Sequence, residues 1–360
     1  MLQRTTTNFS TSLQSKINTL KNKMPKVTLG SLQFDSPLLL APMSAICNAP
    51  FRLLMEDLGA GGTVSELISC HGIAHKNERT KNMLRIDPRE KNIGLQLFGE
   101  NGSVMAEAAK VAEDYGPKFI DINMGCPVKK VVTKGGGSAL LKDPSKLGVF
   151  LKEIKKAISI PLTIKIRTGW DEESINADEV IKIAKEEGVE FVSVHGRTRT
   201  QAYRGNANWD LLEDLAKDSP LPIIGNGDLH STILTKRRME KTNCRALMLG
   251  RGPLRNPFIF LESVVGESEC HLHFTPQDYL EVIERLLHYE ADYAWSDKIL
   301  LVQMRKLIVW MAAGFPGTSH FRAKLFKLNN VNEVLKCTQT FFNGIGDIKK
   351  DIDFEKSFMN

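Results

Sequence analysis

The sequence has no paired cysteines, no long apolar run and no dinucleotide-binding glycine motif. Its six cysteines are scattered and form no C-x-x-C pair; they are Cys47, Cys70, Cys126, Cys244, Cys270 and Cys337. We therefore expect neither a metal site nor a disulfide framework, and we expect a reducing, cytoplasmic location. No apolar run approaches the ~18 residues of a membrane-spanning helix. We therefore expect no membrane partner.

Acidic residues are absent from the first 26 residues, which are rich in Ser, Thr, Asn and Lys. A transit peptide can have this composition, but Arg4 is the only arginine there and the amphipathic pattern is poor. We predict that residues 1–26 are a disordered tail rather than a transit peptide. The whole chain is 42% hydrophobic and carries a net charge of +6, which allows a polyanionic partner without requiring one.

Apolar runs alternate with amphipathic segments from Pro37 to about Val265. Most of the runs are continuous rather than alternating, which is typical of strands buried on both faces of a parallel sheet. The predicted strands are Leu38–Met43, Gly62–Leu67, Ile93–Phe98, Phe119–Asn123, Leu162–Ile166, Phe191–His195, Pro222–Gly225 and Ala246–Gly250. The predicted helices are Pro50–Leu58, Ser103–Tyr115, Pro144–Ile158, Ala177–Glu187, Trp209–Lys217, Ser231–Thr242 and a short one after Arg251.

Eight strands, each followed by a helix, predict an α/β fold, the (β/α)8 TIM barrel. A doubly wound open sheet is the structural alternative, but no G-x-G-x-x-G follows the first strand. After about Glu267 the pattern becomes helical, with a break at Gly314–Gly317. We therefore predict a barrel over residues 27–268, an all-helical domain over 269–345 and a C-terminal tail over 346–360.

Charge is segregated in the predicted helical domain. Its first part is acidic from Asp278 to Asp297, and its second part is basic from Lys298 to Lys336. Two solvated faces that attract each other would explain this pattern, and so would a surface that binds phosphates. The sequence leaves both interpretations open.

The residues Asp121–Pro127 carry the strongest chemical signal. A free cysteine is most often a small buried hydrophobe, but Cys126 stands at the end of the fourth predicted strand. Polar residues at the carboxyl ends of barrel strands build active sites in this fold. Cys126 is therefore a candidate general acid, or a nucleophile if Lys129, Lys130 and Lys134 lower its pKa.

Later strand ends carry cations and glycines. Lys165 and His195 end two successive predicted strands. Each could serve a bound anion, but each also has a purely structural explanation: a lysine that reaches solvent and a histidine that only supports the fold. Asn226–Asp228 and Gly250–Gly252 follow the seventh and eighth strands, where many barrels hold a phosphate. A phosphate there, with two cationic groups nearby, suggests flavin mononucleotide (FMN).

These motifs in this order resemble the dihydrouridine synthases, flavin enzymes that reduce uridines in transfer RNA. The resemblance covers residues 33 to 335 and rests on Ala41–Met43, Asp121–Pro127, His195–Thr198, Asn226–Asp228, Gly250–Gly252 and Met304–Lys306. Cys47-Asn48 departs from the usual Thr-Asp pair, and Pro253 and Arg255 replace small residues.

The resemblance implies a role for each matched residue. Cys126 would be the catalytic proton donor, and substrate would contact Asn123, Arg197, Arg305 and Lys306. FMN would be held by Pro42, Met43, Ser44, Gln96, Lys165, His195, Asn226, Gly227, Asp228, Gly250 and Arg251. NADPH or NADH would be a transient electron donor, tRNA the partner, and no stable protein partner is implied.

The implied reaction moves a hydride from flavin N5 to C6 of uracil and a proton from Cys126 to C5. Two alternatives remain. A barrel similar to dihydroorotate dehydrogenases would act on a free pyrimidine and have no use for a basic helical domain. A non-catalytic RNA-binding barrel would be colourless and indifferent to the loss of Cys126.

Overall fold

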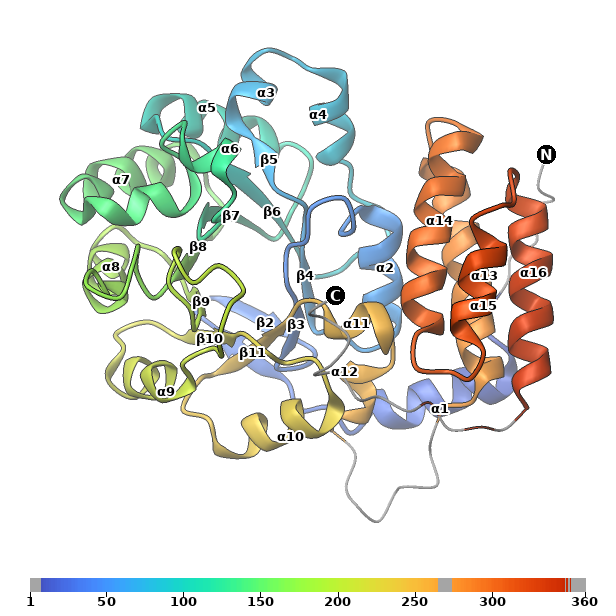
Figure 1. Cartoon of the computed structure of the whole chain (residues 1–360). Coiled ribbons are helices and arrows are strands. Elements are labelled where there is room, and N and C mark those ends of the chain that lie inside the picture. Colours follow the sequence, from blue (N-terminus) through green and yellow to red (C-terminus); the bar gives the residue numbers. More distant parts are fainter. Residues whose placement is uncertain (1–7, 265–273, 347, 349, 351–360) are drawn as a thin grey trace.

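A computed structural model describes residues 8–264, 274–346, 348 and 350, and it confirms the predicted barrel followed by helices (Figure 1). Parallel pairing runs in chain order around the barrel, and the pairs β11–β3 and β4–β6 complete the ring. Its strands are β3 (Leu38–Leu40), β4 (Gly62–Val64), β6 (Ile93–Phe98), β7 (Phe119–Met124), β8 (Leu162–Arg167), β9 (Val192–His195), β10 (Ile223–Asn226) and β11 (Ala246–Leu249). A short strand, β5 (Ile68–Ser69), pairs with the end of β6.

Helices cover the outside of the barrel. They are α2 (Ala49–Asp57), α3 (Cys70–Ala74), α4 (Glu78–Met83), α5 (Gly102–Glu113), α6 (Lys129–Val132), α7 (Leu147–Ala157), α8 (Ala177–Glu186), α9 (Trp209–Asp218), α10 (Thr232–Lys241), α11 (Gly252–Arg255) and α12 (Ile259–Glu262). Two 3₁₀ turns, η1 (Gly137–Lys142) and η2 (Pro144–Lys146), precede α7. Several helices start at a side-chain cap, as at Asn48, Asn101 and Asn208, where the amide oxygen accepts a backbone N–H of the first turn.

A hairpin closes the amino end of the barrel. It consists of β1 (Val27–Leu29) and β2 (Leu32–Phe34), and Phe34 packs edge-on against Phe119 and Phe191. These two phenylalanines lie at the amino ends of β7 and β9. The apolar plug leaves the carboxyl ends of the strands as the open end of the barrel.

Residues 11–21 form a helix, α1 (Thr11–Lys21), where the sequence analysis predicted a disordered tail. Its apolar side chains Leu13, Ile17 and Leu20 are fully buried. Three apolar residues on a polar segment give a weak signal, and α12, which packs against α1, lies more than 200 residues later in the sequence. Residues 1–7, the predicted boundary at 268/269 and most of the predicted tail at 346–360 lie outside the described residues.

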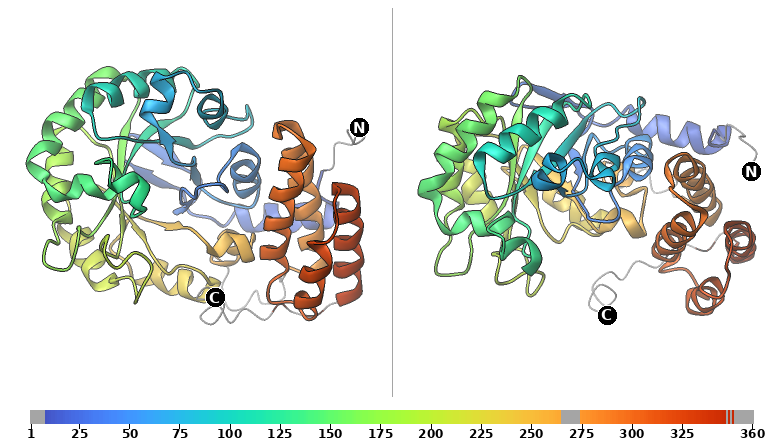
Figure 2. Two further views of the ribbon diagram at one scale, coloured as in Figure 1. Left: turned by 45° about the horizontal axis from the view of Figure 1, so that its top comes forward. Right: turned by 90° about the horizontal axis from the view of Figure 1, so that it is seen from above.

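The C-terminal domain consists of α13 (Pro276–Tyr293), α14 (Asp297–Ala312), α15 (Thr318–Leu325) and α16 (Val331–Ile345). The predicted break is present, because Gly314 and Gly317 have positive φ between α14 and α15. Aromatic side chains Tyr279, Phe315 and Phe342 pack edge-to-face in its core. These helices stand beside the barrel, next to α2 and α11 (Figure 2).

Polar contacts join the helical domain to the barrel. Asn48 donates to Glu290 at 2.8 Å, and the Tyr289 hydroxyl donates to Asp57 at 2.7 Å. Burial raises the pKa of Glu290 to about 7. Asn48 departs from the acid expected there, and its amide supplies a donor where a second carboxylate would repel Glu290.

The acidic residues of α13 contact α1 as well. Asp278 pairs with Lys16 at 2.9 Å, and Glu281 accepts the backbone N–H of Ser10 at 2.9 Å. These acids therefore attach α13 to its neighbours, which leaves the basic residues of α14 to α16 to be explained separately.

Candidate active site

A cavity of about 470 Å³ opens at the carboxyl end of the barrel. Its volume lies within the range of cofactor pockets. It brings together every predicted site residue except Arg305; these are Pro42, Met43, Ser44, Gln96, Asn123, Cys126, Lys165, His195, Arg197, Asn226, Gly227, Asp228, Gly250, Arg251 and Lys306. Residues that sequence reasoning did not select also line it, among them Arg167, Tyr203, His230 and Trp310.

Cys126 follows the end of β7 and is held there through its backbone. Its N–H donates to the Asn123 side-chain oxygen at 2.9 Å, and its carbonyl accepts the Ser138 hydroxyl at 2.8 Å. A side chain at Gly137 would come within 2.9 Å of the Cys126 carbonyl oxygen, and φ there is +60°. The glycine-rich loop therefore packs directly on the segment that carries the thiol.

Burial raises the pKa of the Cys126 thiol above its usual value. The nearby charge that lowers it belongs to Arg167 rather than to the lysines of the following loop, and it is the weaker influence. The environment therefore favours the protonated thiol, which suits a proton donor better than a thiolate nucleophile.

A chain of buried amides lies beneath Cys126. Asn123 donates to the Gln96 side-chain oxygen at 2.8 Å, and Gln96 donates to Asp121 at 2.6 Å. Asp121 also accepts the Thr163 hydroxyl at 2.7 Å. Burial raises the pKa of Asp121 to about 6, although these hydrogen bonds and Lys165 oppose the change.

Lys165 lies in the barrel interior, and its ammonium donates to the Asn226 side-chain oxygen at 3.0 Å. Burial, helped by Arg167, lowers its pKa to about 8. Burial together with four neighbouring cations holds the pKa of His195 well below its usual value, so this imidazole is neutral near pH 7. The lysine and the histidine therefore differ in charge, although they lie on neighbouring strands of the barrel.

Arg167 is a site residue that the sequence analysis missed. It is 2% exposed, and its guanidinium donates to the carbonyls of Gly125, Thr198 and Ala202 at 2.8 to 2.9 Å. It thus fixes the backbone next to Cys126 and the loop after β9. The available signal was its position two residues after Lys165, because alternate residues of a strand share a face.

Arg197 forms a two-pronged ion pair with Asp228, with N–O distances of 2.8 and 2.9 Å. Arg197 is 3% exposed and also donates to the Arg204 carbonyl, so its guanidinium supports two loops as well as lining the cavity. Asp228 and Gly227 both have positive φ. The ion pair therefore stabilises the tight turn after β10, where the sequence predicts a phosphate site.

The helical domain contributes Lys306 and Trp310 of α14 to the cavity. The Lys306 ammonium donates to the Ala45 carbonyl at 2.9 Å, and Glu66 accepts the Ala45 N–H from the other side. Arg305 does not line the cavity. Two of its guanidinium nitrogens are buried without a hydrogen-bond partner in the part of the chain that the structure describes.

Comparison with known proteins finds one family over most of the chain. The model of the family "Dihydrouridine synthase (Dus)" matches residues 39–345. A probable tRNA-dihydrouridine synthase of Rickettsia prowazekii is 34% identical over 332 residues, which cover 90% of this chain and 100% of that protein. The tRNA-dihydrouridine synthase B of Pseudomonas putida is 36% identical over 328 residues, covering 89% and 95% of the two chains.

A solved structure, histamine dehydrogenase from Rhizobium sp. 4-9, shares the fold. Its TM-score is 0.55 at 10% identity, over 93% of this chain and 66% of that one. Among the described residues, no helix is long and apolar enough to cross a membrane.

Proposed function

Because the chain belongs to the dihydrouridine synthase family and is thereby an oxidoreductase, we propose that it reduces the C5=C6 bond of specific uridines in tRNA, with FMN as cofactor. The relatives at 34 to 36% identity are named as enzymes of this kind and match this chain over nearly their whole length. The observation that carries the proposal is the position of the Cys126 thiol on the wall of a cationic cavity at the open end of the barrel, where burial raises its pKa.

The cavity fits FMN in two respects. At the end of β11, a side-chain carbon on Gly250 would meet nothing nearer than the Ala41 side chain at 3.9 Å, so there is free space beside the backbone where a phosphate would approach. Lys165, Arg167 and Arg251 give the wall positive charge. Asn226 to Asp228, Gly250 and Arg251 would hold the phosphate, and Pro42 to Ser44, Gln96, Lys165 and His195 would contact the rest of the cofactor.

Reduced FMN would supply the hydride that reaches C6 of the uracil, after NADPH or NADH has supplied the electrons. Cys126 would donate a proton to C5, where the addition of a hydride leaves negative charge. Asn123 would hold the uracil, since it lines the cavity and its amide nitrogen has an N–H beyond the one given to Gln96. Lys165 would stabilise negative charge on the cofactor as a fixed cation.

We propose that residues 27–268 form the flavin-binding barrel and residues 269–345 the tRNA-binding domain. Basic side chains of α14 to α16, including Arg305 and Lys306, would contact the RNA backbone. The target base has to leave its stack to reach the cavity, which costs a few kcal/mol, and phosphate contacts can offset that cost.

Replacing Cys126 tests the proposal directly. The Cys126→Ala variant should retain bound FMN, visible as its yellow absorbance, while dihydrouridine formation falls by about 100-fold or more, the scale of a lost general acid. Cys126→Ser is the matched control, because its hydroxyl keeps the shape but is a far weaker acid; it should also be impaired. Undiminished turnover in Cys126→Ala would remove the proton-donor role.

The choice of substrate separates the alternatives. Equal activity on free uridine and on tRNA would favour an enzyme similar to dihydroorotate dehydrogenases. A purified protein that binds RNA but takes up no FMN after reconstitution would favour the non-catalytic barrel.

A further inference from the structure

We propose that Asp121 is a positioning residue that sets the direction of two buried amides and, through them, the place of Cys126. The inference rests on the proposed function for the role of Cys126, but the arrangement itself is a property of the fold. Asp121 stands inside β7, two residues before Asn123 and five before the thiol.

An amide side chain is asymmetric, with one donating end and one accepting end, whereas a carboxylate can only accept. The Gln96 nitrogen must therefore face Asp121, at 2.6 Å, and its oxygen must face Asn123. Asn123 must then present its nitrogen to Gln96 at 2.8 Å, which leaves its oxygen for the next partners.

Those next partners are the backbone N–H groups of the catalytic loop. The Asn123 oxygen accepts from Gly125 at 3.2 Å and from Cys126 at 2.9 Å. Because Asp121 fixes the orientation of both amides, it is the Asn123 oxygen that faces the Cys126 N–H and accepts its hydrogen bond. If both amides turned over, the Asn123 nitrogen would face two N–H donors instead.

Because these side chains are buried, a reversed orientation of the two amides would be costly. Gln96 is 1%, Asp121 2% and Asn123 8% exposed, so water cannot substitute for a mismatched partner. The chain is anchored at its far end as well, because Thr163 donates to Asp121 at 2.7 Å and Ser65 accepts the Gln96 backbone N–H at 2.9 Å. A single carboxylate therefore determines the orientation of the two amides that connect it to the Cys126 backbone.

The variant that tests the idea is Asp121→Asn, which preserves shape but presents either an oxygen or a nitrogen to Gln96. We expect kcat for tRNA to fall about 10- to 100-fold, as for a small misplacement of a reacting group. KM for tRNA should stay within about twofold, because the RNA surface is untouched. The rate at which iodoacetamide alkylates Cys126, followed by peptide mass spectrometry on the FMN-free protein, should change at least about threefold.

Thr163→Val is the matched control. It removes the other side-chain partner of Asp121 but leaves the carboxylate, and therefore the direction of the amides, in place. Its alkylation rate and kcat should stay within about threefold of the parent protein.

A second variant reverses the chain instead of breaking it. The double variant combines Asp121→Asn with Asn123→Asp. The new carboxylate at position 123 accepts from the Cys126 N–H and from the Gln96 amide nitrogen, because the Gln96 amide has turned over. The Gln96 oxygen then accepts from the new amide nitrogen at position 121. We expect the alkylation rate of Cys126 to return to within about twofold of the parent value. Turnover need not return, since Asn123 is proposed to contact the substrate.

The outcomes are distinguishable. An unchanged alkylation rate in folded Asp121→Asn would overturn the positioning role, as would a double variant that fails to restore it. If Asp121→Asn does not fold, a folded double variant with normal alkylation supports the proposal and an unfolded one refutes it. If Cys126→Ala keeps full turnover, the proposed proton donor is wrong, whereas the alkylation result still tests the amide chain.

Discussion

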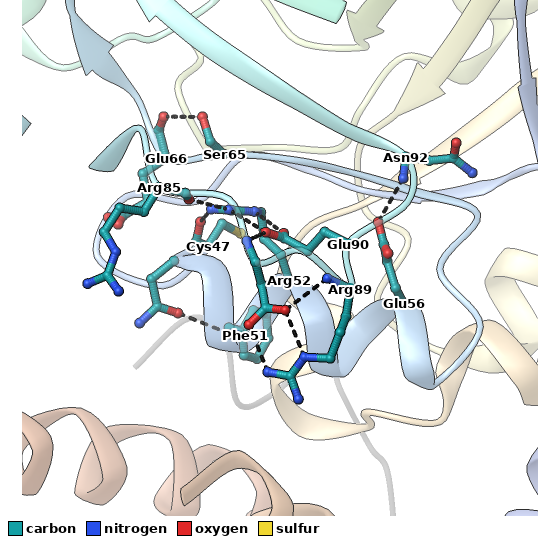
Figure 3. A network of polar contacts seen from close by, with 12 residues as sticks. Cys47, Phe51, Arg52, Glu56, Ser65, Glu66, Arg85, Arg89, Glu90 and Asn92 are labelled. Atoms are coloured by element: carbon teal, nitrogen blue, oxygen red, sulfur yellow. Dashed lines mark hydrogen bonds and ion pairs between the residues drawn. The ribbon is translucent and has the colours of Figure 1, made fainter. Parts of the chain in front are cut away.

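Arg52 offers a quantitative test of the interior beside the site. It lies in α2, is 1% exposed and binds Glu90 through two hydrogen bonds of 2.7 and 3.0 Å (Figure 3). It also donates to the carbonyls of Cys47 at 2.9 Å and Arg85 at 3.0 Å. Glu90 is equally buried and keeps one other donor, the backbone N–H of Asp87.

Arg52→Met keeps the aliphatic stem and removes the charge. It leaves Glu90 as a buried carboxylate without its counter-ion and two carbonyls without a donor. Breaking a buried pair in this way costs about 3–5 kcal/mol of unfolding free energy. Lys182→Met is the control, because Lys182 pairs with Asp178 and both side chains are 63% exposed; this pair should contribute about 1 kcal/mol or less.

The stability that Arg52→Met loses should depend on pH, and the direction of this dependence follows from the pKa of Glu90. Burial raises the pKa of Glu90 even in the intact protein, and the loss of Arg52 removes the largest opposing influence. In the variant the folded state therefore binds a proton more readily than the unfolded state, so its stability falls as pH rises above the ordinary pKa of a glutamate. The difference from the parent protein should be smallest near pH 5.

The assay is urea unfolding followed by circular dichroism at pH 5.5 and 7.5. Adding Glu90→Gln to Arg52→Met should recover about 2 kcal/mol or more at pH 7.5, because the buried charge is gone and an oxygen remains for Asp87 N–H. The reasoning would be refuted if the unfolding free energy of Arg52→Met at pH 7.5 lay within about 1 kcal/mol of that of the parent protein. It would also be refuted if the double variant recovered no stability.

Two further predictions concern the ligands. Since burial lowers the pKa of Lys165 to about 8, its ammonium is charged below that pH and neutral above it. The affinity for FMN, measured by fluorescence quenching, should therefore fall between pH 7 and 9. The Lys165→Met variant should bind FMN weakly, and its affinity should not change over this pH range. A constant affinity in the parent protein would contradict the charge role. Charge reversal at Arg305 or Lys306 should weaken tRNA binding. It should also reduce the slope of log affinity against log salt concentration by about 1 for each phosphate interaction that is removed. An unchanged slope in both variants would show that α14 does not contact phosphate.

The strands of the barrel could be predicted because their apolar runs are nearly uninterrupted. Ile93–Phe98 was predicted with its observed ends as β6, since a strand buried on both faces needs no partner to be recognised. Cys126 could be selected because it follows such a run. The side chains that line the cavity gather there as a consequence of the parallel sheet, whose carboxyl ends all meet at one side.

The parts that were missed depend on partners distant in the sequence. Arg167 is bound by carbonyls 31 to 42 residues away, so its spacing from Lys165 is the one local sign that separates it from a surface arginine at a strand end. Helix α1 has only three buried side chains, and it packs against α12, which lies far away in the sequence. The direction of the Gln96 and Asn123 amides is likewise invisible without the position of Asp121 between them in space.

Helix α1 adds a further connection between the barrel and the C-terminal helices, which also meet where α2 packs against α13 and where α11 packs against α14. It packs against α12, its Lys21 donates to the Glu56 carbonyl in α2, and its Lys16 pairs with Asp278 of α13. The separation between the basic helices and Cys126 is thereby fixed by packing. In the proposed function RNA would span these two places, so the N-terminal helix, which does not line the cavity, would help to set the distance that the RNA has to bridge.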